Sequence, residues 1–104
     1  MPEIRRTIMN SFQDAQECQM FIMILKQKWS EFDADLKEKF TVEIATDIAD
    51  PRKHTAYLTA QSVEDFKIVD EWAKKEVLPL RNRFSPKSNT FTCELEARFE
   101  FGDI

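Results

Sequence analysis

Glycine is almost absent from this chain, since Gly102 is the only one among 104 residues. Phosphate-binding loops, dinucleotide-binding turns and nucleophile elbows need glycine where the backbone approaches a ligand closely or takes a left-handed conformation. The sequence therefore excludes these sites in their usual form. Its turns must be built from Asp, Asn, Ser and Pro instead.

Cysteine is also scarce. The two cysteines, Cys18 and Cys93, form no Cys-x-x-Cys pair, so neither a zinc site nor a thioredoxin-like motif is indicated. Both fall in apolar positions of different expected elements. We therefore expect two buried, reduced thiols rather than a disulfide.

Histidine occurs once, as His54, so any catalytic triad or dyad would have to use this residue. It follows two basic residues beside a turn, and we expect an exposed residue at a strand end. A metal site would need His54 together with Asp47 and Asp50, but Asp residues at turns usually bind backbone amides. We predict no metal and no other cofactor.

No long hydrophobic run is present. The longest, from Met20 to Leu25, is far too short to cross a bilayer, and the stretch from Met1 to Arg6 lacks the apolar core of a secretion signal. From these absences we expect a cytoplasmic protein that does not associate with membranes.

Positive charge is in the minority, with 15 Lys and Arg against 19 Asp and Glu and a formal net charge of −4 at pH 7. Nucleic-acid binding needs basic side chains that displace phosphate counterions, so we expect no nucleic-acid partner. One alternative stays open, a local basic patch formed by residues at expected strand ends and after the second helix. Its members would be Arg5, Arg6, Arg52, Lys53, Arg81, Arg83 and Lys87.

Hydrophobic periodicity predicts a single α+β domain over residues 1–104. Strands are expected at residues 3–11, 40–47, 54–61 and 90–101. Helical structure is expected at 12–36, as one long helix or as two if Ser30 or Asp33 restarts it after a bend, and from 62 to an end or kink near 78, before Pro79. The first helix carries an apolar stripe of Cys18, Ile22, Leu25, Trp29, Phe32 and Leu36. The second of the middle strands should bury Ala56, Leu58 and Ala60.

The order β-α-β-β-α-β predicts a ferredoxin-like fold, a four-stranded antiparallel sheet with two helices on one face. If the first strand does not form, a three-stranded sheet with two helices is the alternative. This plan serves many unrelated functions, so it implies none of them.

The last expected strand alternates apolar and polar residues from Thr90 to Phe101. Its apolar side should bury against the helices, and its polar side should lie on the open, wet face of the sheet. The residues expected to be buried are Phe91, Cys93, Leu95, Ala97, Phe99 and Phe101. The residues expected on the open face are Thr90, Thr92, Glu94, Glu96, Arg98 and Glu100.

Two surfaces are candidates for binding a protein partner. On the first helix, Met20, Met23 and Ile24 lie outside the apolar stripe, which favours contact with a second surface, either a further copy of the chain or another protein. On the open face, an acidic platform of Glu43, Glu94, Glu96 and Glu100, with Tyr57 and Arg98 beside it, could bind a basic protein or imitate nucleic-acid phosphates.

The leading hypothesis is a non-enzymatic protein-binding module: a regulator, inhibitor or assembly component, of the kind that phages encode. It would act through protein contacts or self-association, with no catalytic residues. One alternative is a small cofactor-independent enzyme of the dimeric α+β barrel type. Such an enzyme needs an apolar pocket between helices and sheet with Tyr57, His54 or Arg98 pointing inward. The other alternative is nucleic-acid binding through the basic patch.

Overall fold

A computed structural model describes residues 3–32 and 38–102 of the chain. Within these ranges the chain forms four strands and three helices. They are β1 (Ile4–Ser11), α1 (Ala15–Ser30), β2 (Thr41–Thr46), β3 (Lys53–Ala60), α2 (Val63–Glu76), α3 (Leu78–Phe84) and β4 (Lys87–Glu94). The sequence predicted a first helix as far as Leu36, and this residue lies outside the described ranges.

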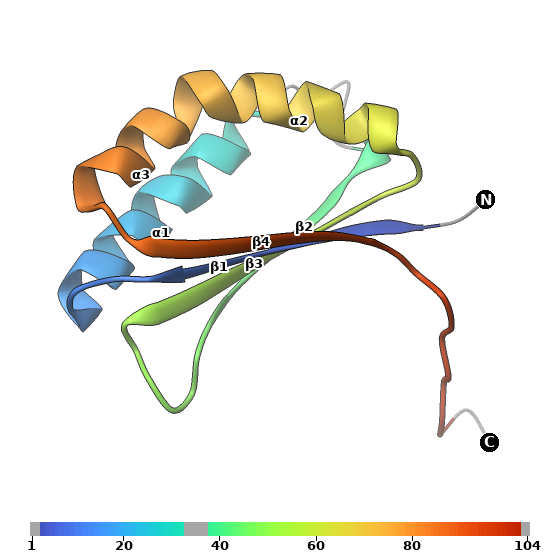
Figure 1. The fold of residues 1–104 in the computed structure, drawn as a ribbon, viewed down its shortest axis with the longest axis horizontal. Helices are drawn as coiled ribbons and strands as arrows, with labels where there is room; N and C mark the ends of the chain where they lie inside the picture. The colour runs from blue at the N-terminus through green and yellow to red at the C-terminus, as the bar shows by residue number, and fades with distance from the viewer. Residues whose placement is uncertain (1–2, 33–37, 103–104) are drawn as a thin grey trace.

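The strands form one antiparallel sheet in the order β2-β3-β1-β4, and the helices cover one of its faces (Figure 1). The first strand is therefore present and central, and the predicted ferredoxin-like arrangement is confirmed. The predicted hairpin of the two middle strands is also confirmed, with Val42 opposite Leu58 and Ile44 opposite Ala56.

Local chemistry explains where the helices begin and end. The side chain of Asp14 accepts a hydrogen bond from the Glu17 amide at 2.8 Å and caps α1, and Ser62 caps α2 in the same way. Pro79 lies in the first turn of α3, where its missing N–H costs nothing, so the predicted break appears as a junction at Val77 between two helices. Ser85 ends α3 with φ at 47°, a left-handed conformation usually left to glycine.

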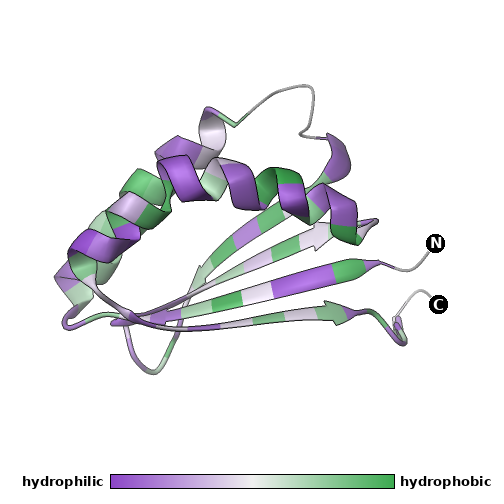
Figure 2. Ribbon diagram, turned by 45° about the horizontal axis from the view of Figure 1, so that its top comes forward, coloured by the Kyte–Doolittle hydropathy of each residue, from purple (hydrophilic) through white to green (hydrophobic). Residues whose placement is uncertain are grey.

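The core lies between the sheet and the helical layer in two adjoining clusters. One cluster is centred on Phe66, Leu58 and Phe32, and the other on Phe21 and Phe12. Figure 2 shows hydrophobic and hydrophilic residues alternating along the helices that cover the sheet. Burial of these large side chains supplies most of the stability of a domain of this size.

The last strand differs from the prediction. It begins earlier and ends earlier, at Glu94, and the chain beyond Leu95 leaves the sheet on the side away from the helices (Figure 1). The residues predicted to be buried are instead exposed, with Phe91 at 54%, Phe99 at 78% and Phe101 at 90%; Cys93 and Ala97 are also exposed and Leu95 is half-buried.

Pairing with β1 is the physical reason for this difference. Ile4 and Ile8 of β1 pack toward the helices, and Ile8 lies opposite Thr90. Directly paired residues share a face, so Thr90 and its alternate neighbours face the helices while Phe91 and Cys93 face the open side. The alternation was predicted correctly, but its direction was wrong.

The two cysteines have different environments. Both are free thiols, as predicted, but only Cys18 is buried, and Cys93 is exposed on β4. Burial raises the pKa of the Cys18 thiol.

No helix in the described part of the chain is long and apolar enough to span a bilayer.

Candidate functional site

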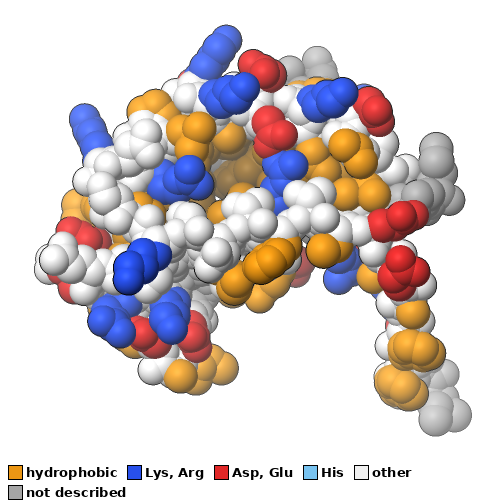
Figure 3. Space-filling model, in the orientation of Figure 1, with side chains coloured by type: hydrophobic (Ala, Val, Ile, Leu, Met, Phe, Trp, Pro, Cys, Tyr) orange, Lys and Arg blue, Asp and Glu red, His pale blue; other side chains and the backbone are white. Residues whose placement is uncertain are grey.

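A cavity of about 340 Å³ lies between the sheet and all three helices. Figure 3 shows it as a hollow of apolar side chains flanked by lysine and arginine side chains. Its apolar wall comes from β1, β3, α1, α2 and α3. The apolar lining residues are Ile8, Phe21, Leu25, Trp29, Ala56, Leu58, Val69, Trp72, Ala73, Val77 and Leu78.

His54 lines this cavity with only 1% of its surface exposed, so the prediction of an exposed strand-end residue is wrong. The reason is register. His54 shares its face of β3 with Ala56 and Leu58, which point toward the helices, and its ring packs against the ring of Phe21 with centroids 5.5 Å apart.

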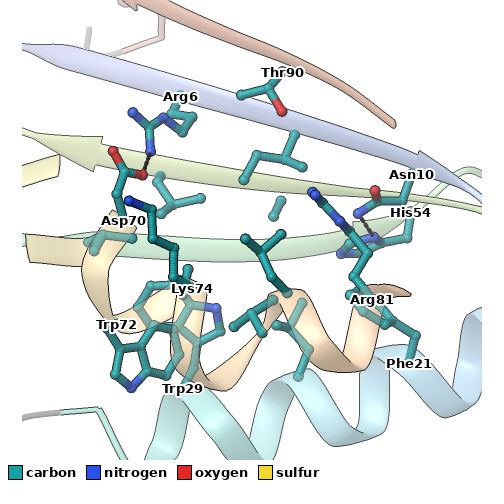
Figure 4. A pocket seen from close by; sticks show the side chains of 18 residues that line it. Arg6, Asn10, Phe21, Trp29, His54, Asp70, Trp72, Lys74, Arg81 and Thr90 are labelled. Carbon is teal, nitrogen blue, oxygen red and sulfur yellow. Dashed lines mark hydrogen bonds and ion pairs between the residues drawn. The ribbon is translucent and has the colours of Figure 1, made fainter. Parts of the chain in front are cut away.

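A polar network crosses three adjacent strands at this end of the cavity. Asn10 lies on β1 directly between His54 on β3 and Ser88 on β4. The Ser88 hydroxyl donates a hydrogen bond to Asn10 Oδ1. Asn10 Nδ2 then donates to His54 Nδ1 at 3.3 Å (Figure 4). Nδ1 is therefore an acceptor, which assigns the ring proton of neutral His54 to Nε2.

His54 Nε2 is buried and has no hydrogen-bond partner among the described residues. Burial lowers the pKa of His54 from 6.5 to about 4, so the ring is neutral near pH 7. A buried polar group without a partner is uncommon in a folded protein and carries a desolvation cost. His54 therefore offers an N–H donor at the cavity wall.

Charged side chains surround the rest of the opening. Arg6 projects from the same face of β1 as Ile8 and forms an ion pair with Asp70 of α2. Its Nε also donates to Thr92 Oγ1 at 3.0 Å, and its guanidinium lies 4.5 Å from the centre of the Phe66 ring. Arg6 thus ties β1, β4 and α2 together while its charge is largely balanced.

Arg81 on α3 is different. It lines the cavity and is half-buried, and its guanidinium has no hydrogen-bond or ion-pair partner within the described ranges. Lys74, the third cation of the opening, forms one ion pair among the residues that the structure describes, with the exposed Glu71 at 3.6 Å. Figure 4 shows two polar ends, Arg6 with Asp70 and Lys74 at one, and Arg81 with Asn10 and His54 at the other.

The three residues that a metal site would have needed, His54, Asp47 and Asp50, do not converge in the structure. Asp50 accepts hydrogen bonds from the Arg52 amide and side chain, which hold the pKa of Asp50 near 2, and Asp47 accepts from the Ala49 amide. Both carboxylates thus bind local groups of the hairpin turn, as expected of Asp at turns, while His54 is buried beneath the helices.

The helical surface predicted to bind a partner is exposed at two of its three residues. Met20 is 45% exposed and Met23 64% exposed on the outer side of α1, and Ile24 is half-buried. Met20 and Met23, together with Gln19, border a shallow groove on that helix, and the buried residue of the groove is Ile22. Ile24 does not line it. Their role in partner binding stays a prediction.

The acidic platform is not assembled as predicted. Glu43 and Tyr57 are paired neighbours on the open face, and Tyr57 is 44% exposed. Glu94 lies opposite Ile4 and therefore belongs to the helix-facing side at the sheet edge. Glu96 and Glu100 follow the end of β4, and Arg98 forms an ion pair with Glu3 at 2.9 Å. Of the four expected carboxylates, Glu43 is thus the one that β2, β3, β1 or β4 places on the open face, which also carries Phe91 and Met9.

The basic patch does not gather as one surface either. Arg6 and Arg81 line the cavity, whereas Arg52 forms an ion pair with Asp50 at the hairpin turn and Arg5 forms one with Glu3 at 2.8 Å.

The sequence analysis did not identify Asn10, Arg6 and Arg81 as cavity residues. The two-residue period of β1, in which Arg6 and Asn10 alternate with outward residues, was the available signal for two of them.

Comparison with known proteins found no matching family model and no matching curated protein. Solved structures do match. A dimeric ferredoxin-like protein from an uncultured marine organism has a TM-score of 0.75 and 14% identity, over 98% of this chain and 95% of that chain. SnoaB, a cofactor-independent oxygenase from Streptomyces nogalater, has a TM-score of 0.66 and 12% identity, over 97% and 98%. A protein from Bordetella bronchiseptica described as an antibiotic biosynthesis monooxygenase has a TM-score of 0.64 and 14% identity, over 93% of this chain and 100% of that chain.

These likenesses establish the fold, and they correct two expectations. The hypothesis of a non-enzymatic binding module, and with it the prediction of no enzyme, is contradicted by similar structures described as oxygenases and monooxygenases. Neither an inhibitor nor a phage role finds support among them. The comparisons favour the enzyme of the dimeric α+β barrel type, which was the alternative.

Proposed function

We propose that this protein is a cofactor-independent oxygenase that acts on a flat, apolar substrate and works as a homodimer. The observation that carries the proposal is the cavity of about 340 Å³, which combines an apolar wall with the unpartnered, buried Nε2 of His54. Largely apolar pockets with a few convergent polar groups are typical of small-molecule sites. SnoaB, which has the same fold, is described as a cofactor-independent oxygenase.

The shape of the cavity favours ring-containing substrates. The rings of Trp29 and Trp72 lie with centroids 4.5 Å apart at one wall, and aliphatic side chains such as Ile8 and Leu58 line the sheet side. Aromatic and aliphatic surfaces of this kind bind flat apolar molecules through area burial and ring contacts.

The electron balance restricts which oxidations an enzyme without a cofactor can catalyse. Monooxygenation normally needs an external reductant, which a cofactor supplies. Without one, the substrate itself must supply all of the electrons. Oxidation of a ring-flanked CH₂ group meets this condition: one atom of O₂ remains on carbon as a carbonyl, and the other leaves as water with both hydrogens of the CH₂.

The residues of this chain would bind and orient the substrate. His54 is neutral near pH 7 and carries its proton on Nε2, so it suits hydrogen bonding to a substrate oxygen better than removing a proton. Asn10 and Ser88 would act as positioning residues, because their hydrogen bonds hold the ring in this tautomer.

A second copy of the chain would cover the open face of the sheet. Met9, Tyr57 and Phe91 expose 39%, 44% and 54% of their surfaces there, and Cys93 is exposed beside them. Soluble monomers seldom leave a contiguous apolar patch uncovered. The similar marine proteins are described as dimeric.

Oxygen uptake with a dihydroxyanthrone tests the proposal, because its CH₂ group lies between two rings and its quinone product absorbs visible light. With no cofactor added, we expect equal amounts of O₂ consumed and quinone formed, at a rate well above the uncatalysed oxidation. Ala73→Phe, which fills the cavity from α2, should lower kcat/KM by about tenfold or more.

Ala97→Phe is the matched control, since Ala97 is exposed and does not line the cavity. It should oxidise the anthrone at the wild-type rate. Equal rates for Ala73→Phe and wild type, with both proteins folded, would contradict catalysis in this cavity. Absence of any protein-dependent oxidation across a range of electron-rich aromatics would count against the oxygenase itself.

A further inference from the structure

The two polar ends of the cavity differ in their charge balance. At one end Arg6 is paired with Asp70 and also contacts Thr92 and the Phe66 ring, so its charge and donors are engaged. At the other end Arg81 has no partner for its guanidinium in the described part of the chain. Arg81 is therefore a half-buried cation at the cavity wall that is free to bind a charged ligand group.

An unpaired arginine in this position favours an anion. A half-buried charge is screened less by water and salt than one on the open surface, and guanidinium binds carboxylates and phenolates through paired N–H donors. The junction between α2 and α3 determines its position. Because α3 starts anew at Leu78, its axis can differ from that of α2, and Arg81 lines the cavity at the end where Asn10 and His54 lie (Figure 4).

His54 supplies a second donor at the same end. Its Nε2 is buried, carries the ring proton and has no partner among the described residues. A ligand oxygen that accepted this N–H would remove the cost of leaving it unsatisfied. The intervening wall, with Ile8 and Ala56, is apolar and would contact the body of the ligand.

We propose that the cavity selects an apolar, ring-containing ligand with a single negative charge. Arg81 binds the anionic group and His54 Nε2 donates to an oxygen at the same end. This inference rests on the proposed function in one respect only, since it names the substrate class for the same cavity. The anionic group can be a carboxylate or a phenolate, because both offer the oxygen acceptors that these donors require.

Fluorescence of the two tryptophans measures the binding directly. Trp29 and Trp72 are the only tryptophans of the chain, and both line the cavity. The probes are naphthoate and its uncharged amide, naphthamide, which share one ring system. We expect wild type to bind naphthoate about tenfold or more tightly than naphthamide near neutral pH.

Arg81→Gln should remove this preference by weakening naphthoate binding alone. Arg83→Gln is the matched control, because Arg83 is exposed on the same helix and does not line the cavity. Arg81→Met keeps the apolar stem of the side chain, and it replaces Arg81→Gln if circular dichroism shows that Arg81→Gln fails to fold. Binding of naphthol, measured across the pH range in which its hydroxyl ionises, distinguishes the two anionic groups. An affinity that rises as naphthol ionises indicates a site for phenolates. A constant affinity restricts the site to carboxylates.

Equal affinity of wild type for naphthoate and naphthamide would overturn the inference. Equal selectivity in the Arg81 and Arg83 variants would overturn the role of Arg81. These measurements involve no turnover, so the two proposals fail separately. Anthrone oxidation without charge selectivity would refute the ligand class alone, and charge selectivity without any oxidation would refute the oxygenase alone.

Discussion

His54 links the cavity to the stability of the protein through its protonation. Its folded pKa of about 4 lies below the ordinary value of 6.5 because burial penalises the imidazolium. Between these two pH values the unfolded chain binds more protons than the folded one. The free energy of unfolding therefore falls as the pH drops through this window, by about 3 kcal/mol at most.

Urea unfolding at several pH values measures this linkage. Between about pH 7 and about pH 5 we expect wild type to lose about 2 kcal/mol of unfolding free energy. His54→Gln does not titrate, and its side-chain oxygen can still accept from Asn10, so its loss over this range should be much smaller. The lowered pKa of Asp50, about 2, places its contribution below this window.

Parallel pH dependence in wild type and His54→Gln would mean that His54 is solvated in solution and would remove the basis for its role as a neutral donor.

The burial of His54 could have been predicted from the sequence. His54, Ala56, Leu58 and Ala60 share one period, and the last three were predicted to be inward. The basic neighbours at the turn suggested exposure instead. Period is the stronger signal, because strand geometry determines side-chain direction whatever the neighbours are.

At the scale of elements, β4 shows what alternation leaves undetermined. An amphipathic strand has two distinct sides, but its own sequence does not say which side meets the helices. That is decided by the partner strand, through the opposition of Thr90 to Ile8 and of Phe91 to Thr7. The usual assumption, apolar toward the helices, fails for β4 because its register with β1 places Phe91 and Cys93 on the open face.

Matched leucine truncations test this reversal. Leu58 on β3 is 2% exposed, and Leu58→Ala should lower the unfolding free energy by about 2–5 kcal/mol. Leu95, predicted to be core, is half-buried just beyond β4, so Leu95→Ala should cost about 1 kcal/mol or less. Thermal or urea unfolding of the two variants decides the point, and a loss at Leu95 as large as that at Leu58 would restore the inward direction first expected.

For the whole molecule, the sequence was sufficient for architecture and insufficient for the site. Helix caps at Asp14 and Ser62, the break before Pro79 and the central hairpin all follow from local patterns. The cavity instead depends on residues from six separate elements, β1, β3, β4, α1, α2 and α3, that meet only in three dimensions. Arg6 and Arg81 illustrate this, because each looked like an ordinary surface cation in its own segment.

Assembly of two copies is tested by replacing one apolar side chain on each candidate surface with a charged one. By light scattering we expect wild type to have twice the mass of one chain. Phe91→Glu on the open face should shift it toward the monomer, because a carboxylate buried without a partner is costly. Met23→Glu on the outer side of α1 should leave the dimer intact. The reverse pattern would assign the interface to the helix, and a monomeric wild type would refute the dimer.

The pairing of Ile4 with Glu94 brings the beginning of β1 beside the end of β4. The hairpin between β2 and β3, by contrast, projects with Ile48 fully exposed at its tip. A short bridge between the first and last strands, with new ends opened at that tip, would therefore produce a circular permutant that keeps every strand pairing and every cavity residue. The spatial arrangement of this fold is in that sense independent of the order in which the chain visits its elements.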